Sequence, residues 1–387
     1  MERYRRSGAI AIGILCGTLL LAQLMAGGCG RDEPEIPIVL LSEEVSLHPP
    51  TELVRTPSGN LVALVAEGED CVLTLYRSGP DGQLWRRWQA LPAPEGIREV
   101  DLSVDGNLLV VAGNRGQAIW ISTLAIDPQS PEDSIPSSTE LPAKQTVVSL
   151  AIAAIASVPD EAPELQLAYL VGDPADSQRV MMRRWSLDGG VSWSEPRQLG
   201  EGILGRVALE TRPSGGKSAD LCFSREGFLR WRGLSGSDRT DEFRITLRVA
   251  PDSRNEIARM GLGVLVVGES ARHQVVASAS DNSGRNWSAA MALARNADHP
   301  RVPDIDAGFG RYWVTYSSGD TTLAVRTATD PSRPTYWSRG IYFRETRCLG
   351  EPSIVALPDS SAGLLFAVPD GKVYFARVTP PQEQGRE

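Results

Sequence analysis

The chain has 387 residues, of which 42% are hydrophobic and 22% charged, so it can build a sizeable core and is not globally disordered. Its formal net charge is −9, and an acidic body is repelled by phosphate backbones, which excludes nucleic acid as an expected partner. The 27 prolines and 37 glycines are spread along the chain, as in folds with many short strands and tight turns.

Residues 1–28 have the layout of an export signal. Arg3, Arg5 and Arg6 precede an apolar run from about Ala9 to Met25, and three small residues follow that run. The segment LMAGGC, which ends at Cys29, resembles a bacterial lipobox, and this resemblance implies cleavage before Cys29 and lipid on its thiol. An uncleaved anchor helix is the alternative, because the apolar run is just long enough to span a thin bilayer.

Either interpretation places the rest of the chain outside the cytoplasm, with the membrane as a partner. Gly30 after the cysteine, rather than Asp, favours the outer membrane if the cell has one. We expect a signal peptide over 1–28, a polar tether over 29–36, one β domain over 37–379 and a disordered tail over 380–387.

The remaining cysteines and the histidines give no metal signature. Three cysteines lie beyond Cys29, far apart and without CxxC spacing, so neither a zinc site nor a disulfide framework is expected, although one disulfide stays open. Cys71 and Cys222 lie in apolar runs and are expected to be buried. The three histidines are isolated, and turn roles are expected for Asp304 and Asp306, so we expect no metal and no cofactor.

Beyond residue 37 the sequence shows no convincing amphipathic helix. Short runs rich in Val, Ile, Leu, Tyr and Trp alternate with Gly, Pro, Asp or Ser, for example LVALVAE (61–67), AIWIST (118–123) and KVYFARV (372–378). Strands at this spacing predict a sandwich, a barrel or a propeller.

A longer repeat favours the propeller. Residues 186–193 (SLDGGVSW) and 280–287 (SDNSGRNW) fit S-x-[DN]-x-G-x-x-W, with a weaker copy at 78–85 and a degenerate one ending at Trp337. Successive tryptophans of these copies are 108, 94 and 50 residues apart, close to one or two multiples of about 50. A four-stranded propeller blade takes about 40–50 residues.

The residue types of this motif are those of a packed turn. The Asp or Asn accepts hydrogen bonds from turn N–H groups, Gly adopts a conformation that a Cβ would oppose, and Trp buries a large apolar area. We therefore expect structural roles, away from any ligand, and largely buried tryptophans. The residues concerned are Ser186, Asp188, Gly190, Trp193, Ser280, Asn282, Gly284 and Trp287.

These copies resemble Asp boxes, also called BNR repeats, and the chain resembles the sialidase superfamily of β-propellers. Residues 50–67 resemble the family's opening strands, and 351–367 resemble its last blade. The resemblance implies an all-β, sialidase-like β-propeller with the six blades usual in that family. The number of strand-rich segments instead favours seven blades, with IVLLS (38–42) closing the last. These segments are 50–92, 99–142, 146–199, 205–248, 256–294, 299–344 and 350–379.

The family's catalytic motifs are largely unmatched. Family sialidases use three arginines for the substrate carboxylate, and only Arg225 matches one of them, since 47–50 and 320–323 lack the other two. Glu351 aligns with the family's nucleophilic Tyr and Glu210 with the Glu that activates it. The loop that carries the acid/base Asp is absent after residue 69.

We therefore expect a non-catalytic surface module that binds a glycan or a protein at the propeller mouth. The alternative is an exo-acting glycoside hydrolase with a rearranged site of Glu210, Arg225 and Glu351. That alternative needs both carboxyls in one cleft, about 5–10 Å apart. Trp88, Trp120 and Trp231 could line such a mouth, but core positions are expected for them.

Overall fold

The computed structural model describes residues 36–43, 51–126, 135–155, 162–173, 179–211, 218–235, 242–294, 301–318, 322–344, 346 and 348–381. The predicted signal peptide, Cys29, the tether up to residue 35 and the tail from residue 382 lie outside these ranges. All strands lie in the compact unit that begins at Pro37. In the described ranges the one helical segment is a 3-10 turn, Pro334–Tyr336, as the all-β prediction requires.

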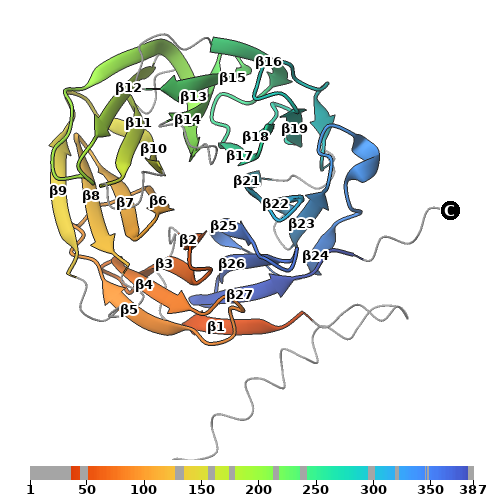
Figure 1. The fold of residues 1–387 in the computed structure, drawn as a ribbon, viewed down its shortest axis with the longest axis horizontal. Coiled ribbons are helices and arrows are strands. Elements are labelled where there is room, and N and C mark those ends of the chain that lie inside the picture. Colours follow the sequence, from red (N-terminus) through yellow and green to blue (C-terminus); the bar gives the residue numbers. More distant parts are fainter. Residues whose placement is uncertain are drawn as a thin grey trace, which may run out of the picture. The chain divides into compact units, whose positions relative to one another are not determined.

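The strands form antiparallel sheets arranged as blades around a central axis (Figure 1). Blade 1 holds β2 (Thr51–Arg55), β3 (Leu61–Glu67), β4 (Val72–Ser78) and β5 (Arg86–Ala90). Blade 2 holds β6 (Val100–Asp105), β7 (Leu108–Arg115), β8 (Ala118–Ala125) and β9 (Ser137–Pro142). Blade 3 holds β10 (Val147–Ile155), β11 (Glu164–Val171), β12 (Arg179–Ser186) and the first part of β13 (Arg197–Thr211).

The second half of the ring repeats this order. Blade 4 holds the second part of β13, β14 (Ser218–Arg225), β15 (Phe228–Ser235) and β16 (Glu242–Arg248). Blade 5 holds β17 (Asn255–Met260), β18 (Gly263–Glu269), β19 (Val275–Ser280) and β20 (Met291–Ala292). Blade 6 holds β21 (Arg301–Gly308), β22 (Arg311–Ser318), β23 (Thr322–Ala328) and β24 (Ile341–Arg344).

Blade 7 joins the two ends of the propeller. It holds β25 (Leu349–Ala356), β26 (Ala362–Val368), β27 (Lys372–Val378) and, as its outer strand, β1 (Ile38–Ser42) from the other end of the chain. β1 pairs antiparallel with β27, so the predicted closure by residues 38–42 is confirmed. The described strands thus make seven blades, the number that the sequence segments favoured over the family's six.

Blades 3 and 4 share one strand. The first part of β13 pairs with β12 and the second with β14, which merges the two blades into one seven-stranded sheet. The register shifts between Leu204 and Ala208, next to Gly205, whose φ is +69°. A Cβ at Gly205 would lie 2.5 Å from the carbonyl oxygen of Ser253, so only glycine lets the strand pass from one blade to the next.

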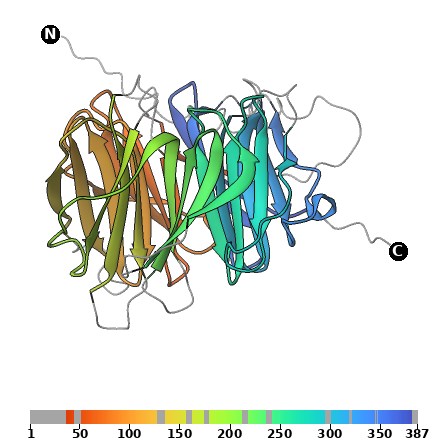
Figure 2. The same ribbon diagram turned by 90° about the horizontal axis from the view of Figure 1, so that it is seen from above.

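The seven innermost strands define two faces. Consecutive inner strands, β2, β6, β10, β13, β17, β21 and β25, contact one another, and β25 contacts β2. They all run in the same direction along the axis, and we call the face where they begin the upper face and the face where they end the lower face (Figure 2). The first hairpin of each blade and the turn between its third and fourth strands therefore lie on the lower face.

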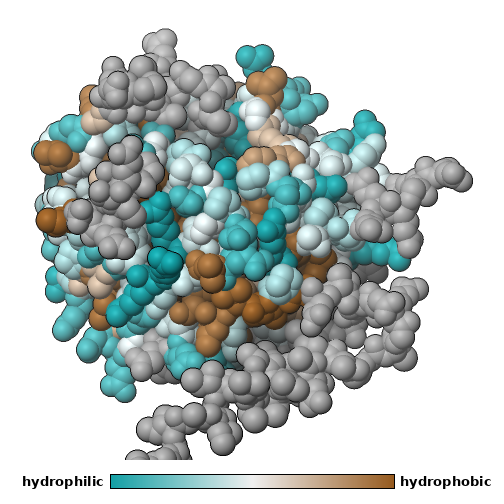
Figure 3. Space-filling model, turned by 60° about the horizontal axis from the view of Figure 1, so that its bottom comes forward, coloured by the Kyte–Doolittle hydropathy of each residue, from teal (hydrophilic) through white to brown (hydrophobic). Residues whose placement is uncertain are grey.

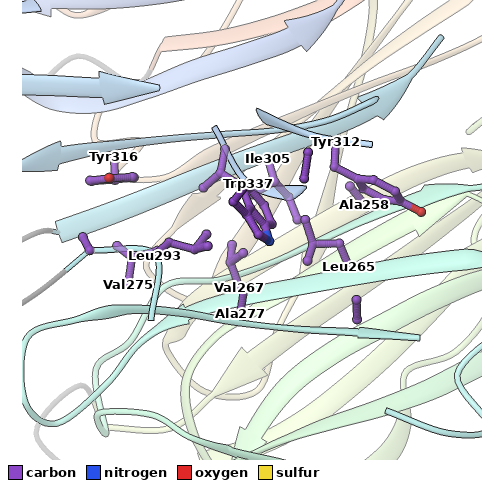
Figure 4. Packing of buried hydrophobic residues seen from close by; sticks show 14 of the residues in the cluster. Ala258, Leu265, Val267, Val275, Ala277, Leu293, Ile305, Tyr312, Tyr316 and Trp337 are labelled. Atoms are coloured by element: carbon purple, nitrogen blue, oxygen red, sulfur yellow. The ribbon is translucent and has the colours of Figure 1, made fainter. Parts of the chain in front are cut away.

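Apolar side chains fill the spaces between blades. Between blades 5 and 6, Leu265 and Val267 of β18 pack against Tyr312 and Val314 of β22, and Trp337 lies buried among them (Figure 4). Because both faces of most strands are covered by a neighbouring blade, the strands are nearly continuous apolar runs. Trp120 and Trp231 belong to such clusters, which confirms the core positions predicted for them.

The S-x-[DN]-x-G-x-x-W segments form compact turns on the lower face. The Ser186 hydroxyl accepts the Gly190 N–H at 2.8 Å, while a carboxylate oxygen of Asp188 accepts the Ser192 N–H at 2.9 Å. Ser280, Asn282, Gly284 and Asn286 repeat this pattern. Trp193 is half-buried and donates to the Gly190 carbonyl at 3.1 Å.

The tryptophans of the motif lie at the margin of the apolar clusters or inside them. Trp193, Trp287 and Trp85 are half-buried, whereas Trp337 of the degenerate copy is 7% exposed. Each of the first three packs against the apolar cluster between two blades. In the coloured part of Figure 3, hydrophilic side chains predominate, and brown, apolar side chains form one central patch and occur singly elsewhere.

Two expectations about single residues were wrong. Cys71 is exposed, because it lies in the turn between β3 and β4 with φ at 53°, while Cys222 is fully buried as predicted. Asp304 and Asp306 lie in the inner strand β21, not in turns. Within the described ranges, no helix is both long enough and apolar enough to cross a membrane.

Candidate functional site

A cavity of about 350 Å³ lies on the propeller axis. Every blade contributes to its wall through its innermost strand. The lining residues fall within 52–55, 99–104, 150–153, 206–211, 254–257, 304–307 and 351–355. The wall carries eight carboxylates and three guanidinium groups from Glu52, Arg55, Glu99, Asp101, Arg206, Glu210, Arg254, Glu256, Asp304, Asp306 and Glu351.

Two arginines organise the charges near the upper face. Arg254, immediately before β17, forms ion pairs with Glu256 (Nε to Oε1, 2.5 Å), Glu351 and, more distantly, Glu52 (Nη2 to Oε1, 3.8 Å). Its side chain is only 12% exposed. Because Arg254 contacts carboxylates from blades 1, 5 and 7, it ties the two ends of the chain together at the axis.

Arg206 of β13 holds the other side of the same network. Its Nη1 lies 2.6 Å from Oε1 of Glu351 and 3.6 Å from Oε1 of Glu99. Its side chain is 37% exposed and that of Glu351 25% exposed, so solvent reaches this layer. Glu351 thus has one oxygen on each arginine, and neither guanidinium is left to receive an anionic ligand without displacing it.

Burial shifts the protonation of this upper layer. Burial raises the pKa of Glu52 well above its usual value and also raises that of Glu99, against the attraction of Arg206 and Arg254. Burial lowers the pKa of Arg206, while for Arg254 it is outweighed by Glu256 and Glu52, so the pKa of Arg254 rises. Both arginines remain charged at neutral pH.

Three aspartates deeper in the cavity clamp neighbouring blades. One carboxylate oxygen of Asp101 accepts the Ile152 N–H of the next inner strand at 2.6 Å. Asp304 and Asp306 accept the N–H groups of Ile354 (2.8 Å) and Ala356 (2.7 Å) in the same way. This clamp is the physical reason why Asp304 and Asp306 lie on a strand, where the sequence prediction placed turns.

These clamp aspartates are also poised to hold protons. Burial raises the pKa of Asp101 to about 7, that of Asp304 to about 7 and that of Asp306 to about 6, even though each accepts backbone N–H groups that oppose the shift. The cavity is therefore less negative near neutral pH than its eight carboxylates suggest.

The three residues that the sequence aligned with a catalytic site do not come together. Glu351 and Glu210 both line the cavity, but Arg225 does not; it ends β14 and lies 4.0 Å from Glu242. Glu351 contacts Arg206, and Glu210 is four residues further along β13, which corresponds to about 13 Å along the axis. Burial, followed by repulsion from Asp306 and Asp220, raises the pKa of Glu210 well above its usual value.

Sequence reasoning missed Arg206, Arg254, Glu52, Glu99 and Glu256. Part of the signal was present, because the inner strands β6 and β21 carry charged or hydroxyl residues at alternate positions, as in VDLSVD (100–105) and PDIDAG (303–308). Such alternation on the first strand of a blade marks the axis-facing side, since strand side chains point to opposite faces in turn.

The described part of the chain holds no group of three or more His, Cys, Asp or Glu side chains arranged for a metal ion. His273 is exposed beside Glu269, while His48 and His299 lie outside the described ranges. Cys71, Cys222 and Cys348 are free thiols.

No family model and no curated protein matches this sequence. Among solved structures, a lectin of Aleuria aurantia, a six-bladed β-propeller, aligns with a TM-score of 0.54 at 10% identity, over 78% of this chain and 97% of the lectin. The sialidase NanB from Streptococcus pneumoniae aligns with a TM-score of 0.45 at 10% identity over 92% and 72% of the two chains, and the Hadza microbial sialidase Hz136 with 0.47 at 13% over 85% and 65%. At these identities the lectin likeness shows the fold alone: this chain is similar to known β-propellers.

Proposed function

We propose that this chain is an exported lipoprotein, anchored through lipid on Cys29, whose propeller binds a neutral, hydroxyl-rich ligand such as a glycan without cleaving it. The binding proposal rests on the ion pairs of Arg206 and Arg254 with Glu351, Glu99 and Glu256, because these pairs leave neither guanidinium available for an anionic ligand. The S-x-[DN]-x-G-x-x-W turns are proposed as structural Asp boxes on the face opposite the ligand.

The charges of the cavity select against acidic sugars. A carboxylate ligand needs convergent, available guanidinium groups, and here both upper arginines already bind carboxylates. Glu351, which is held between the two arginines and is 25% exposed, instead offers its remaining lone pairs to ligand hydroxyls, which bind charged acceptors more strongly than neutral ones. The Aleuria aurantia lectin is described in complex with fucosides, so fucosides are sensible first ligands to test.

A glycan array probed with the full chain tests this proposal. We expect binding to neutral glycans and none to their sialylated forms. Glu351→Gln should weaken that binding about tenfold, since a hydrogen bond to a charged group contributes about 1.5–3 kcal/mol. Glu140→Gln, on the outer strand β9 and 52% exposed, is the matched control and should leave affinity unchanged. Preference for sialylated glycans would contradict the proposal.

A rearranged glycoside hydrolase is the second candidate, because Glu210 and Glu351 share the cavity and the pKa of Glu210 is raised as for a general acid. Against it, Glu351 contacts Arg206, which precedes Glu210 by four residues or about 13 Å of extended strand, whereas two-carboxylate hydrolysis uses carboxyls about 5–10 Å apart. Turnover of any glycoside in a substrate panel, abolished by both Glu210→Gln and Glu351→Gln, would establish this candidate and refute the non-catalytic proposal.

A further inference from the structure

Exposed large apolar side chains are concentrated on the lower face. Of the ten in the described ranges, seven lie on lower-face turns, and the five most exposed, at 65–88%, are all among these seven. The three others, Leu40, Val72 and Tyr342, are 40–46% exposed. We call the seven the lower tips: Leu84, Ile135, Leu187, Val191, Leu262, Phe309 and Tyr336.

The fold itself does not require apolar residues at these positions. Leu187 and Val191 occupy variable positions of the S-x-[DN]-x-G-x-x-W motif, as Leu84 does in the weaker copy. Leu262 is at the tip of the hairpin between β17 and β18. Hairpin turns favour Gly, Asn and Asp, so exposed leucines and valines there indicate contact with an apolar environment.

The chain also enters the propeller on the lower face. Ile38, the first residue of β1, pairs with Ala376 of β27. Ala376 pairs with Leu364 of β26, and Leu364 pairs with Ile354, near the end of the inner strand β25. Residues 29–36 can span at most about 27 Å. A lipid on Cys29 would therefore hold the membrane within that distance of the lower face.

The distribution of the lower tips matches a plane and not a compact partner. They come from blades 1, 2, 3, 5 and 6, so they surround the axis instead of forming one patch. Exposed Arg285 and Arg333 lie on lower-face turns, and exposed Arg86 is the first residue of β5, so guanidinium groups of three of these blades would meet lipid phosphates.

We infer that the lower face rests on the lipid bilayer, with the lower tips in the interfacial region and the cavity's upper mouth directed away from the membrane. This inference rests on the proposed lipidation of Cys29. It gives the binding module a fixed orientation, in which ligands arrive from the side facing away from the anchoring membrane.

Depth-dependent quenching tests this orientation. The full chain, purified from a bacterial membrane in a Cys71→Ser, Cys348→Ser background that removes the two accessible thiols, carries a fluorophore on Leu187→Cys or Leu262→Cys and is reconstituted in phosphatidylcholine vesicles that contain nitroxide-labelled acyl chains. We expect several-fold quenching at both lower tips. Val72→Cys, on the upper face and 41% exposed, is the matched control and should keep its fluorescence.

The outcomes separate the inference from the proposed anchoring. Mass spectrometry of the same preparation reads the lipid on Cys29. If Cys29 is lipidated but the lower tips are quenched no more than Val72→Cys, the orientation is wrong while the anchoring stands. If the lower tips are shielded from aqueous iodide yet not quenched by lipid, a protein covers them and the inference is overturned. If Cys29 carries no lipid and the chain does not bind the vesicles, both the proposed anchoring and the orientation are overturned.

Discussion

Arg254 is the residue on which the charged wall of the cavity depends. It contacts Glu52, Glu256 and Glu351 from three blades with a side chain that is 12% exposed. A buried ion pair adds little net stability compared with an apolar pair, but removal of one partner leaves unpaired charges in a poor solvent. The loss of Arg254 should therefore affect the whole ring more than its own contacts suggest.

We expect Arg254→Met to lower the free energy of unfolding by about 3–5 kcal/mol, because it leaves buried carboxylates without their cation. Chemical denaturation of the variant and the wild type measures this difference. Lys372→Met is the matched control: Lys372 pairs with Asp370 at the surface, where water screens an ion pair and its loss changes stability little. Equal losses for the two variants would show that the network is not structurally important.

At the scale of elements, strands and blade closure could be predicted and the cavity could not. Apolar runs such as LVALVAE predict β3 within a residue, and the spacing of the tryptophans predicts the blades. Periodicity can mark which side of an inner strand faces the axis, but it does not show which side chains pair there, because Arg206, Arg254 and Glu351 are far apart in sequence and approach only when the ring closes. The shared strand β13 was also missed, since one glycine, Gly205, decides it.

The turn glycines allow a matched test of packing. Gly284 has φ at +83°, and a Cβ there would lie 2.9 Å from the Trp231 ring. Gly261, in the same blade, has φ at +61° and no atom within 4 Å of such a Cβ. Gly261→Ala should therefore cost about 1–2 kcal/mol from backbone conformation alone, and Gly284→Ala about 2–5 kcal/mol because overpacking is added.

Thermal unfolding of the two alanine variants, beside the wild type, measures this difference. A larger drop in Tm for Gly284→Ala than for Gly261→Ala is the expected result. Similar drops would mean that the Trp231 ring moves aside easily, and that the turn does not need to pack tightly against it.

At the scale of the whole molecule, the closed ring buries acids on its axis, and stability should depend on pH in an unusual direction. Burial raises the pKa of Asp101 and Asp304 to about 7 and that of Asp306 to about 6, from an ordinary value of 3.8. Between about pH 4 and pH 7 the folded chain therefore holds protons that the unfolded chain has released. Because the folded state binds more protons in this window, these carboxyls stabilise it most below about pH 4. Their contribution is lost as the pH rises through 6–7.

We expect Tm to fall between pH 5 and pH 8, by about 1–2 °C for each kcal/mol lost. Calorimetry at constant ionic strength measures it. Asp101→Asn removes one of the shifted groups while keeping an amide oxygen for the Ile152 N–H, so its Tm should vary less with pH than that of the wild type. Asp188 shifts in the opposite direction, because the hydroxyl and N–H of Ser192 lower its pKa to about 2. The stabilisation by its ionised form is lost only below about pH 4, so Asp188 does not contribute to the change between pH 5 and pH 8. A wild-type Tm that rises from pH 5 to pH 8 would show that the axial carboxyls are ionised in the folded ring.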